Sequence, residues 1–206
     1  MKYSYLVLVR HGESLWNKKG LWTGWRDISL SAGGKKEALN VAKTIRHIKF
    51  DIVTTSSLKR AIKTWEIIRD ALNLHHLIPI KHHALNERHY GIFTGKNKWE
   101  IKKAVGDTEF QRIRRGWDTP IPEGETLKDV FGRVIPHFQA NIWPKILEGK
   151  NVLVVAHGNT NRAIIKHLEN IPHEKIGEVE MNTGEVVIYK IDNQGKIIHK
   201  EKRATN

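Results

Sequence analysis

Residues 6–17 read LVLVRHGESLWN, and residues 152–163 read VLVVAHGNTNRA. Each stretch is an apolar run that leads to a His-Gly pair and then continues into a polar loop. Continuous apolar runs of this length are typical of strands that are buried on both faces of a parallel sheet. The two stretches therefore predict two buried strands, each with a histidine just beyond its end.

The position of the His-Gly pairs is more informative than their number. With 12 His and 16 Gly in 206 residues, about one such pair is expected by chance. In an open parallel sheet, however, ligands bind at the carboxyl ends of the strands. If the two strands are neighbours, His11 and His157 meet in one pocket although they are far apart in the sequence.

The rest of the chain alternates strand-like and helix-like segments. The predicted strands are 5–9, 51–54, 77–80, 151–156 and 186–191, the last of which we expect to be the final strand. The predicted helices are 31–48 with Ser31 as N-cap, 58–72, 126–146 with a kink or break at Pro136 and Pro144, and 160–168. The alternation predicts an α/β fold, a three-layer sandwich with a mostly parallel central sheet flanked by helices. We expect one domain over residues 1–206, with a helical insertion at about 84–125.

Composition excludes several classes of protein. Hydrophobic residues make up 39% of the chain, which can fill a core, and there is no cysteine for disulfides or thiolate metal sites. No apolar run reaches the roughly 18 residues needed to span a bilayer, and no signal-peptide pattern is recognised. We therefore expect a cytoplasmic protein without membrane association.

The net charge of +13 is compatible with a polyanion partner, a small anionic substrate or a lysine-rich solvated surface. The lysines are spread over the whole length and form no block of five or six like charges. Nucleic-acid binding more often uses a cluster on one element, so we expect no nucleic-acid partner.

Two facing imidazoles suit either a metal ion or a phosphoryl group. The H-E-x-x-H type of ligand spacing is absent, and the adjacent pairs His75-His76 and His82-His83 are expected at the surface, with side chains that diverge. Arg10 beside His11 favours an anion, because arginine binds phosphate oxygens in a fork. One neutral imidazole then attacks phosphorus, while the other, as a cation, stabilises the equatorial oxygens. We expect no metal.

These residues lie in a chain that resembles the histidine phosphatase superfamily, and specifically its 2,3-bisphosphoglycerate-dependent phosphoglycerate mutases. The matching stretches are LVLVRHGESLWN, TGWRDISLS, TSSLKRAIKT, LNERHYGIFTGKNK, RRGW and VAHGNTNRAIIKHLENI, between residues 6 and 171. The RHG motif alone indicates only the superfamily, whereas LNERHYG and RRG resemble the mutase branch. The resemblance implies interconversion of 2-phosphoglycerate and 3-phosphoglycerate in glycolysis and gluconeogenesis, with 2,3-bisphosphoglycerate as the priming phosphoryl donor.

The resemblance also implies residue roles. His11 is the residue phosphorylated during turnover, and Glu87 is the general acid and base. Arg10, Arg60 and His157 hold the transferred phosphoryl group. The residues implied to bind or line the substrate pocket are Ser14, Asn17, Thr23, Gly24, Arg88, Tyr90, Lys98, Arg114, Arg115, Gly158 and Asn159.

The chain departs from the longer mutases in two places. Trp117 to Glu125 connects directly where they carry an extra segment, so we expect a monomer or homodimer. Thr160-Asn161 replaces their usual Ser-Leu, a change that the sequence does not explain.

Two alternative functions stay open. One is a phosphatase of the same superfamily that acts on small phosphate esters, and the other is a basic binding protein without the chemistry.

Overall fold

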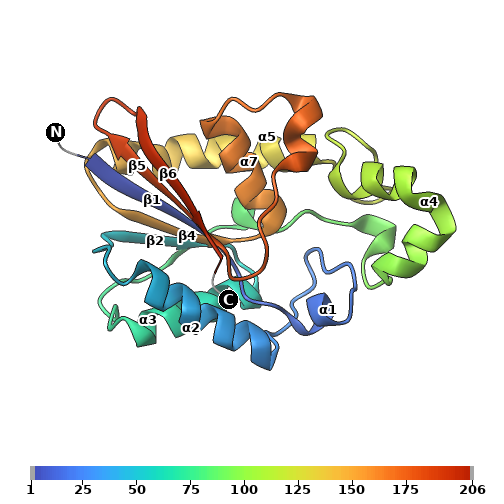
Figure 1. Cartoon of the computed structure of the whole chain (residues 1–206), viewed down its shortest axis with the longest axis horizontal. Coiled ribbons are helices and arrows are strands. Elements are labelled where there is room, and N and C mark those ends of the chain that lie inside the picture. Colours follow the sequence, from blue (N-terminus) through green and yellow to red (C-terminus); the bar gives the residue numbers. More distant parts are fainter. Residues whose placement is uncertain (1–2, 205–206) are drawn as a thin grey trace.

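The computed structural model describes residues 3–204, which contain a six-stranded sheet (Figure 1). Across the sheet the strand order is β3-β2-β4-β1-β5-β6. The strands are β1 (Tyr3–Arg10), β2 (Ile52–Thr55), β3 (Ile80–Lys81), β4 (Val152–Ala156), β5 (Val186–Asp192) and β6 (Ile197–Arg203). The first four run parallel to one another, and β5 runs antiparallel to both β1 and β6. The sheet is therefore mostly parallel, as predicted.

Helices cover both faces of the sheet (Figure 1). One face is covered by α2 (Ala32–Ile45) and α3 (Lys59–Ala71), and the other by α5 (Leu127–His137), α6 (Trp143–Leu147) and α7 (Gly158–Leu168). Side chains alternate along a strand, so Leu6 and Leu8 of β1 enter the core under α5 and α7, while Val7 and Val9 enter the core under α2 and α3. This arrangement confirms the predicted three-layer α/β fold.

Several predicted elements differ in extent from those observed. The strand expected at 77–80 is reduced to Ile80–Lys81, and β5 is followed by β6, so the expectation that residues 186–191 form the final strand is wrong. The sequence Ile197–Arg203 lacks an apolar run because β6 is an edge strand with mostly exposed or half-buried side chains. The helix expected at 126–146 is interrupted, but between the two prolines and not at them: a π-helical turn, Phe138–Ile142, separates α5 from α6. Pro136 lies inside α5, and Pro144 lies in the first turn of α6, where a missing N–H is tolerated.

Residues 84–125 lie beside the sheet and carry the long helix α4 (Lys98–Arg115) and two 3₁₀ turns, His83–Leu85 and Gly91–Phe93. The helix is interrupted at Gly106, whose φ of 80° is left-handed and unfavourable for other residues. Side chains from this segment and from the loop after β1 form a small apolar core of their own. It contains Trp22, Tyr90, Phe110, Ile113 and Ile121. This core fixes α4 next to the carboxyl end of β1.

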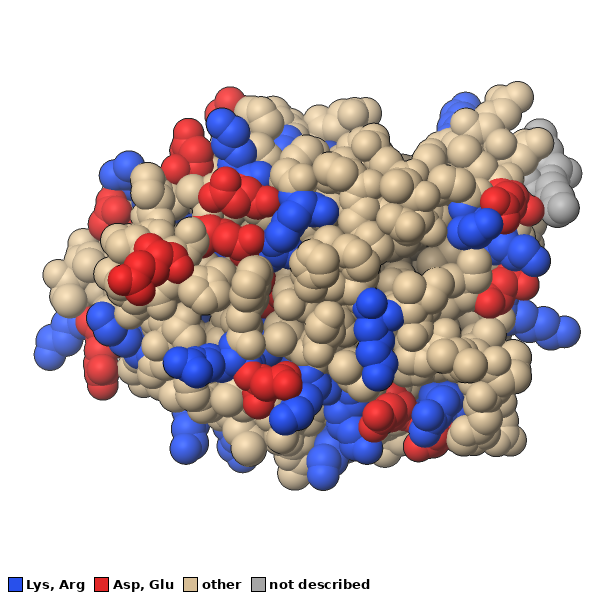
Figure 2. Space-filling view, turned by 180° about the vertical axis from the view of Figure 1, so that it is seen from behind, with Lys and Arg blue, Asp and Glu red and all other residues tan. Residues whose placement is uncertain are grey.

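Two further short elements are the helix α1 (Leu15–Lys18) and a third 3₁₀ turn, His173–Glu178. On the face shown in Figure 2, Lys and Arg are interspersed with Asp and Glu. Among residues 3–204, no helix is long and apolar enough to cross a bilayer.

Candidate active site

The two histidines singled out in the sequence lie side by side. Strands β1 and β4 are hydrogen-bonded neighbours, and Arg10 is in register with Ala156. His11 and His157 follow at the adjoining strand ends, with ring centroids 4.9 Å apart and planes at 62°. Both side chains are buried, at 2% and 0% exposure. The predicted meeting of the two imidazoles is therefore observed.

Two hydrogen bonds show which ring nitrogen of His11 carries the proton. Nδ1 lies 2.7 Å from the carbonyl oxygen of Gly12, which can only accept, so Nδ1 carries the proton. Nε2 accepts a hydrogen bond of 3.1 Å from Nε of Arg60. Burial, Arg60 and Arg10 together lower the pKa of His11 well below its usual range. His11 is thus neutral at pH 7 and keeps a lone pair on Nε2.

His157 has a partner that we did not predict. Its Nε2 lies 2.7 Å from Oγ of Ser56, which follows β2. Burial lowers the pKa of His157 well below its usual range, and the nearby Arg60 adds to the effect. His157 is therefore neutral at pH 7, so the expectation that the second imidazole is a cation is wrong, because a buried site beside arginines disfavours a further positive charge. Ser56 lies within the quoted stretch TSSLKRAIKT, directly after a predicted strand, and that position is the signal that could have identified it.

Arg60 organises the inner part of the pocket. Besides the bond to His11, its guanidinium donates to the carbonyl oxygens of Gly24 (2.8 Å) and Arg26 (2.9 Å). Burial lowers the pKa of Arg60 to about 10, so the side chain stays cationic at pH 7. Asn17, Thr23 and Gly24 line this inner cavity together with Arg10 and His11. Ser14 does not line it: the Ser14 hydroxyl caps α1 and donates to Oδ1 of Asn17, so its effect on the pocket is indirect.

Three buried polar atoms next to the inner cavity have no hydrogen-bond partner within the described part of the chain. They are Nε of Arg10, Nδ1 of His157 and Oγ1 of Thr23. Unpaired buried donors are costly in a finished protein, and they are typical of sites completed by a ligand. All three can donate to oxygen, so the set fits a phosphoryl group.

Glu87 lies at the junction of the inner and outer cavities. Its Oε1 accepts from the backbone N–H groups of Arg88 (2.8 Å) and Asn159 (3.3 Å). Its carbonyl oxygen accepts from Nε1 of Trp25 (2.6 Å) and Nη2 of Arg133 (2.9 Å). Backbone and side chain are both held, so the carboxylate has a fixed position facing the pocket.

Thr160, which stands where the longer mutases have Ser, helps to hold the backbone that carries Glu87. Its hydroxyl lies within hydrogen-bond distance of the carbonyl oxygens of Asn86 (2.8 Å) and Leu85 (3.2 Å), immediately before Glu87. Asn161 donates to the sulfur of Met181 on the opposite wall. The pair Thr160-Asn161 therefore links α7 to both walls of the site.

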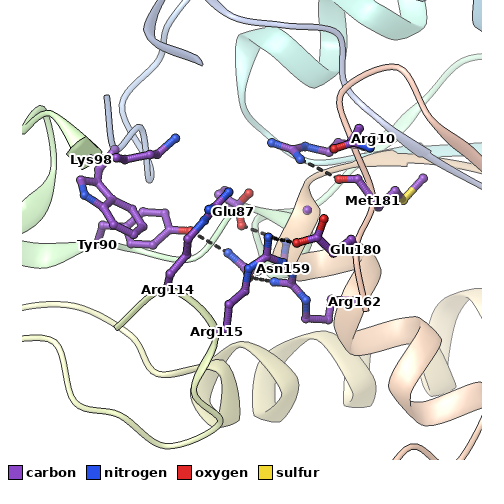
Figure 3. A pocket seen from close by; sticks show the side chains of 13 residues that line it. Arg10, Glu87, Tyr90, Lys98, Arg114, Arg115, Asn159, Arg162, Glu180 and Met181 are labelled. Atoms are coloured by element: carbon purple, nitrogen blue, oxygen red, sulfur yellow. Dashed lines mark hydrogen bonds and ion pairs between the residues drawn. The ribbon is translucent and has the colours of Figure 1, made fainter. Parts of the chain in front are cut away.

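The outer cavity is strongly cationic (Figure 3). Of the residues implied by the resemblance, it is lined by Arg10, Glu87, Tyr90, Lys98, Arg114, Arg115, Gly158 and Asn159. Burial, Arg10 and Arg114 lower the pKa of Lys98 to about 8. Five further lining residues are not in the implied set: Trp22, Arg162, Glu180, Met181 and Asn182. Arg162 is buried on α7, where its guanidinium donates to Oδ1 of Asn159 and to the carbonyl oxygen of Val179.

The expectation that Arg88 binds substrate is not supported by its position. Arg88 is fully buried and lines neither cavity. Its guanidinium donates to the carbonyl oxygens of Glu125, Ile113 and Thr119. Arg88 therefore holds the loop of Glu87 against α4 instead of contacting a ligand.

The prediction that the side chains of His82 and His83 diverge is wrong, whereas the expected surface position is confirmed for His83, which is exposed. Their rings are stacked 4.5 Å apart, because the chain enters a 3₁₀ turn there, and His82 stacks on His137 of α5 at 4.0 Å. His82 is half-buried as a result. Within residues 3–204 no group of three or more His, Asp or Glu side chains is placed to hold a metal ion.

The chain belongs to branch 1 of the histidine phosphatase superfamily, whose sequence profile matches residues 6–202. Within it, the phosphoglycerate mutase of Schizosaccharomyces pombe is 45% identical over 198 residues, which cover 95% of this chain and 94% of that protein. The 2,3-bisphosphoglycerate-dependent phosphoglycerate mutase of Mesorhizobium japonicum is 43% identical, with 95% and 96% of the two chains covered. These relatives confirm the resemblance to the phosphoglycerate mutases.

Solved structures agree with this assignment of the fold. Bacillus stearothermophilus YhfR superposes with a TM-score of 0.80 at 28% identity, over 94% of each chain. A mycobacterial glucosyl-3-phosphoglycerate phosphatase superposes with a TM-score of 0.78 over 98% of each chain, and at 20% identity it shows the common fold alone.

Proposed function

We propose that this chain is a 2,3-bisphosphoglycerate-dependent phosphoglycerate mutase, which interconverts 2-phosphoglycerate and 3-phosphoglycerate in the cytoplasm. The observation that carries the proposal is the pair of buried imidazoles, His11 and His157, at adjoining strand ends beside unpaired buried donors. The phosphoglycerate mutases that are 45% and 43% identical to this chain support the same activity.

His11 is the nucleophile of this mechanism. Its Nε2 attacks phosphorus, an N–P bond forms, and the leaving oxygen takes a proton from Glu87. Bound 2,3-bisphosphoglycerate supplies the phosphoryl group that first primes His11. In the transition state, the equatorial oxygens of the transferred phosphoryl group receive hydrogen bonds from Arg10, Arg60 and His157.

The primed site then acts on the monophosphate. The C2 hydroxyl of 3-phosphoglycerate attacks phosphorus on His11, the N–P bond breaks, and Glu87 takes the hydroxyl proton. After the ligand has turned in the pocket, His11 accepts the phosphoryl group from the C3 oxygen. Glu87 returns its proton to that oxygen, and 2-phosphoglycerate leaves.

Cations of the outer cavity keep the ligand bound while it turns. Lys98, Arg114 and Arg115 pair with the carboxylate or the second phosphate, and Tyr90 donates its hydroxyl hydrogen. Because Lys98, Arg114 and Arg115, together with the arginines of the inner cavity, compensate the charge of the ligand, we expect no metal requirement. A phosphatase differs only in the fate of phospho-His11, which water hydrolyses before the ligand is rephosphorylated.

One assay tests the proposed function. Conversion of 3-phosphoglycerate to 2-phosphoglycerate should be fast with added 2,3-bisphosphoglycerate and much slower without it, with little release of inorganic phosphate. Release of inorganic phosphate as the main product would indicate the phosphatase. Binding of phosphoglycerates without turnover would indicate a binding protein.

A further inference from the structure

Glu180 lies on the wall of the cationic cavity and has no part in the mechanism above (Figure 3). Together with Glu87 it is one of two acidic side chains lining the outer cavity within the described residues. Glu87 faces the inner cavity as well, whereas Glu180 lines only the outer one of the two. A second carboxylate in a site for a highly charged anion repels the ligand, so it requires an explanation.

The backbone around Glu180 is held in place by the site. Three successive carbonyl oxygens each accept a hydrogen bond from a cationic side chain of a different element. The pairs are Arg162 to Val179 (2.8 Å), Lys202 to Glu180 (2.7 Å) and Arg10 to Met181 (2.6 Å). This segment cannot swing away without breaking all three bonds, so the place of Glu180 beside the cavity does not depend on its side chain.

The carboxylate of Glu180 binds Arg115. Nη2 of Arg115 donates to Oε1 of Glu180, and the two side chains come from separate parts of the chain, the end of α4 and the segment before β5. Arg115 is 16% exposed, whereas Glu180 is 56% exposed. The glutamate can therefore rotate into solvent when a ligand anion takes its place, while the arginine stays in the wall.

The cationic cluster needs a counter-ion when no ligand is bound. Burial and Arg114 both lower the pKa of Arg115, and burial and Arg115 lower the pKa of Arg162 to about 10. The larger cause of both shifts is burial of a charged group, and repulsion between the neighbouring cations adds to it. Glu180 is the acidic side chain that opposes this repulsion at Arg115.

We propose that Glu180 is a specificity-determining residue: it competes with the anionic end of the substrate for Arg115, and it penalises ligands with more negative charge most strongly. The inference rests on the proposed function for the identity of the ligand. A ligand that displaces Glu180 keeps a carboxylate near its own anionic end, and like charges repel. Glu180 therefore lowers the affinity for the bisphosphorylated ligand more than it lowers the affinity for the monophosphates.

Calorimetric binding of 3-phosphoglycerate and of 2,3-bisphosphoglycerate to Glu180→Gln tests the competition. Glutamine keeps the size of the side chain and removes its charge. We expect the Kd of 3-phosphoglycerate to fall about 2- to 5-fold, as suits a solvent-screened pair, and the Kd of 2,3-bisphosphoglycerate to fall more. The matched control is Glu178→Gln, which removes the same charge from an exposed position two residues away; its Kd values should change less than those of Glu180→Gln.

A double variant separates competition from long-range charge. In an Arg115→Ala background, Glu180→Gln should lose most of its gain in affinity, because the cation that the Glu180 carboxylate binds has been removed. An undiminished gain, equal effects of the two glutamine variants, or weaker binding by Glu180→Gln would each overturn the proposal. Failure of the unmodified protein to bind phosphoglycerates would instead overturn the proposed function.

Discussion

Nε of Arg60 lies 3.1 Å from Nε2 of His11, so a buried cation donates to the lone pair that attacks phosphorus. This bond fixes the imidazole, whose other nitrogen donates to Gly12. The same bond engages the lone pair on Nε2 of His11. An anionic oxygen of a bound phosphoryl group is a stronger acceptor, so we expect Arg60 to donate to that oxygen instead. Entry of the ligand therefore frees the nucleophile and places the cation on the group to be transferred.

Lys98 should make substrate binding depend on pH in the alkaline range. Its pKa of about 8 means that the ammonium loses its proton as the pH rises through that value, so an attraction for the ligand is lost. We expect the KM for 3-phosphoglycerate to rise between pH 7.5 and 9. In Lys98→Arg, which stays charged, this rise should disappear, whereas the exposed Lys96→Arg should keep it. A KM that is constant over this range in the unmodified protein would contradict the assignment.

Arg115 should matter more for mutase activity than for hydrolysis. Arg115→Ala removes a charge-assisted hydrogen bond to the ligand, and such a bond contributes roughly 1.5–3 kcal/mol, so kcat/KM for 3-phosphoglycerate should fall about 10-fold or more. Hydrolysis of a generic phosphate ester, which has no second anionic group, should change little. Equal losses in both reactions would mean that Arg115 does not retain the far end of the substrate.

Much of the fold and of the inner site could be predicted because both follow from local pattern. The apolar runs before His11 and His157 reveal two parallel strands, and the carboxyl-end rule brings their histidines together. Strand β6 was missed because an exposed edge strand needs no apolar run. Ser31 was correctly predicted as an N-cap: its hydroxyl accepts from the backbone of Gly34.

The remaining site residues depend on tertiary contacts that have no local signature. The sequence around Arg88 and Arg162 gives no sign of which arginine faces the pocket. In the structure, Arg88 donates to backbone carbonyl groups away from the pocket, whereas Arg162 lines the outer cavity. Glu180 follows a 3₁₀ turn with no motif around it, and only the packing of that segment against α4 brings it to Arg115. The role of Thr160 likewise requires the loop of Glu87 to lie against α7.

Chelation should leave activity unchanged. The charges of the transferred group are matched by the guanidinium groups of Arg10 and Arg60, so we expect no divalent ion to be needed for charge compensation. The rate of 3-phosphoglycerate conversion should be the same before and after dialysis against EDTA. Strong inhibition that manganese reverses would require a different mechanism.

The assembly should be a monomer or a homodimer. The resemblance implies that the direct connection over residues 117–125 omits a segment of the longer mutases, and with it surface for contacts between subunits. Multi-angle light scattering at micromolar concentration should give a mass of one or two chains of 23.8 kDa. A stable tetramer would refute this expectation.

The central claim is that His11 carries the phosphoryl group. After incubation with 2,3-bisphosphoglycerate, the unmodified protein should hold one phosphate per chain, labile to acid and stable to base, which mass spectrometry of peptides places on His11. The exposed His75→Ala should label equally, and His11→Ala should not label. Phosphate on another residue, or normal labelling of His11→Ala, would contradict the account.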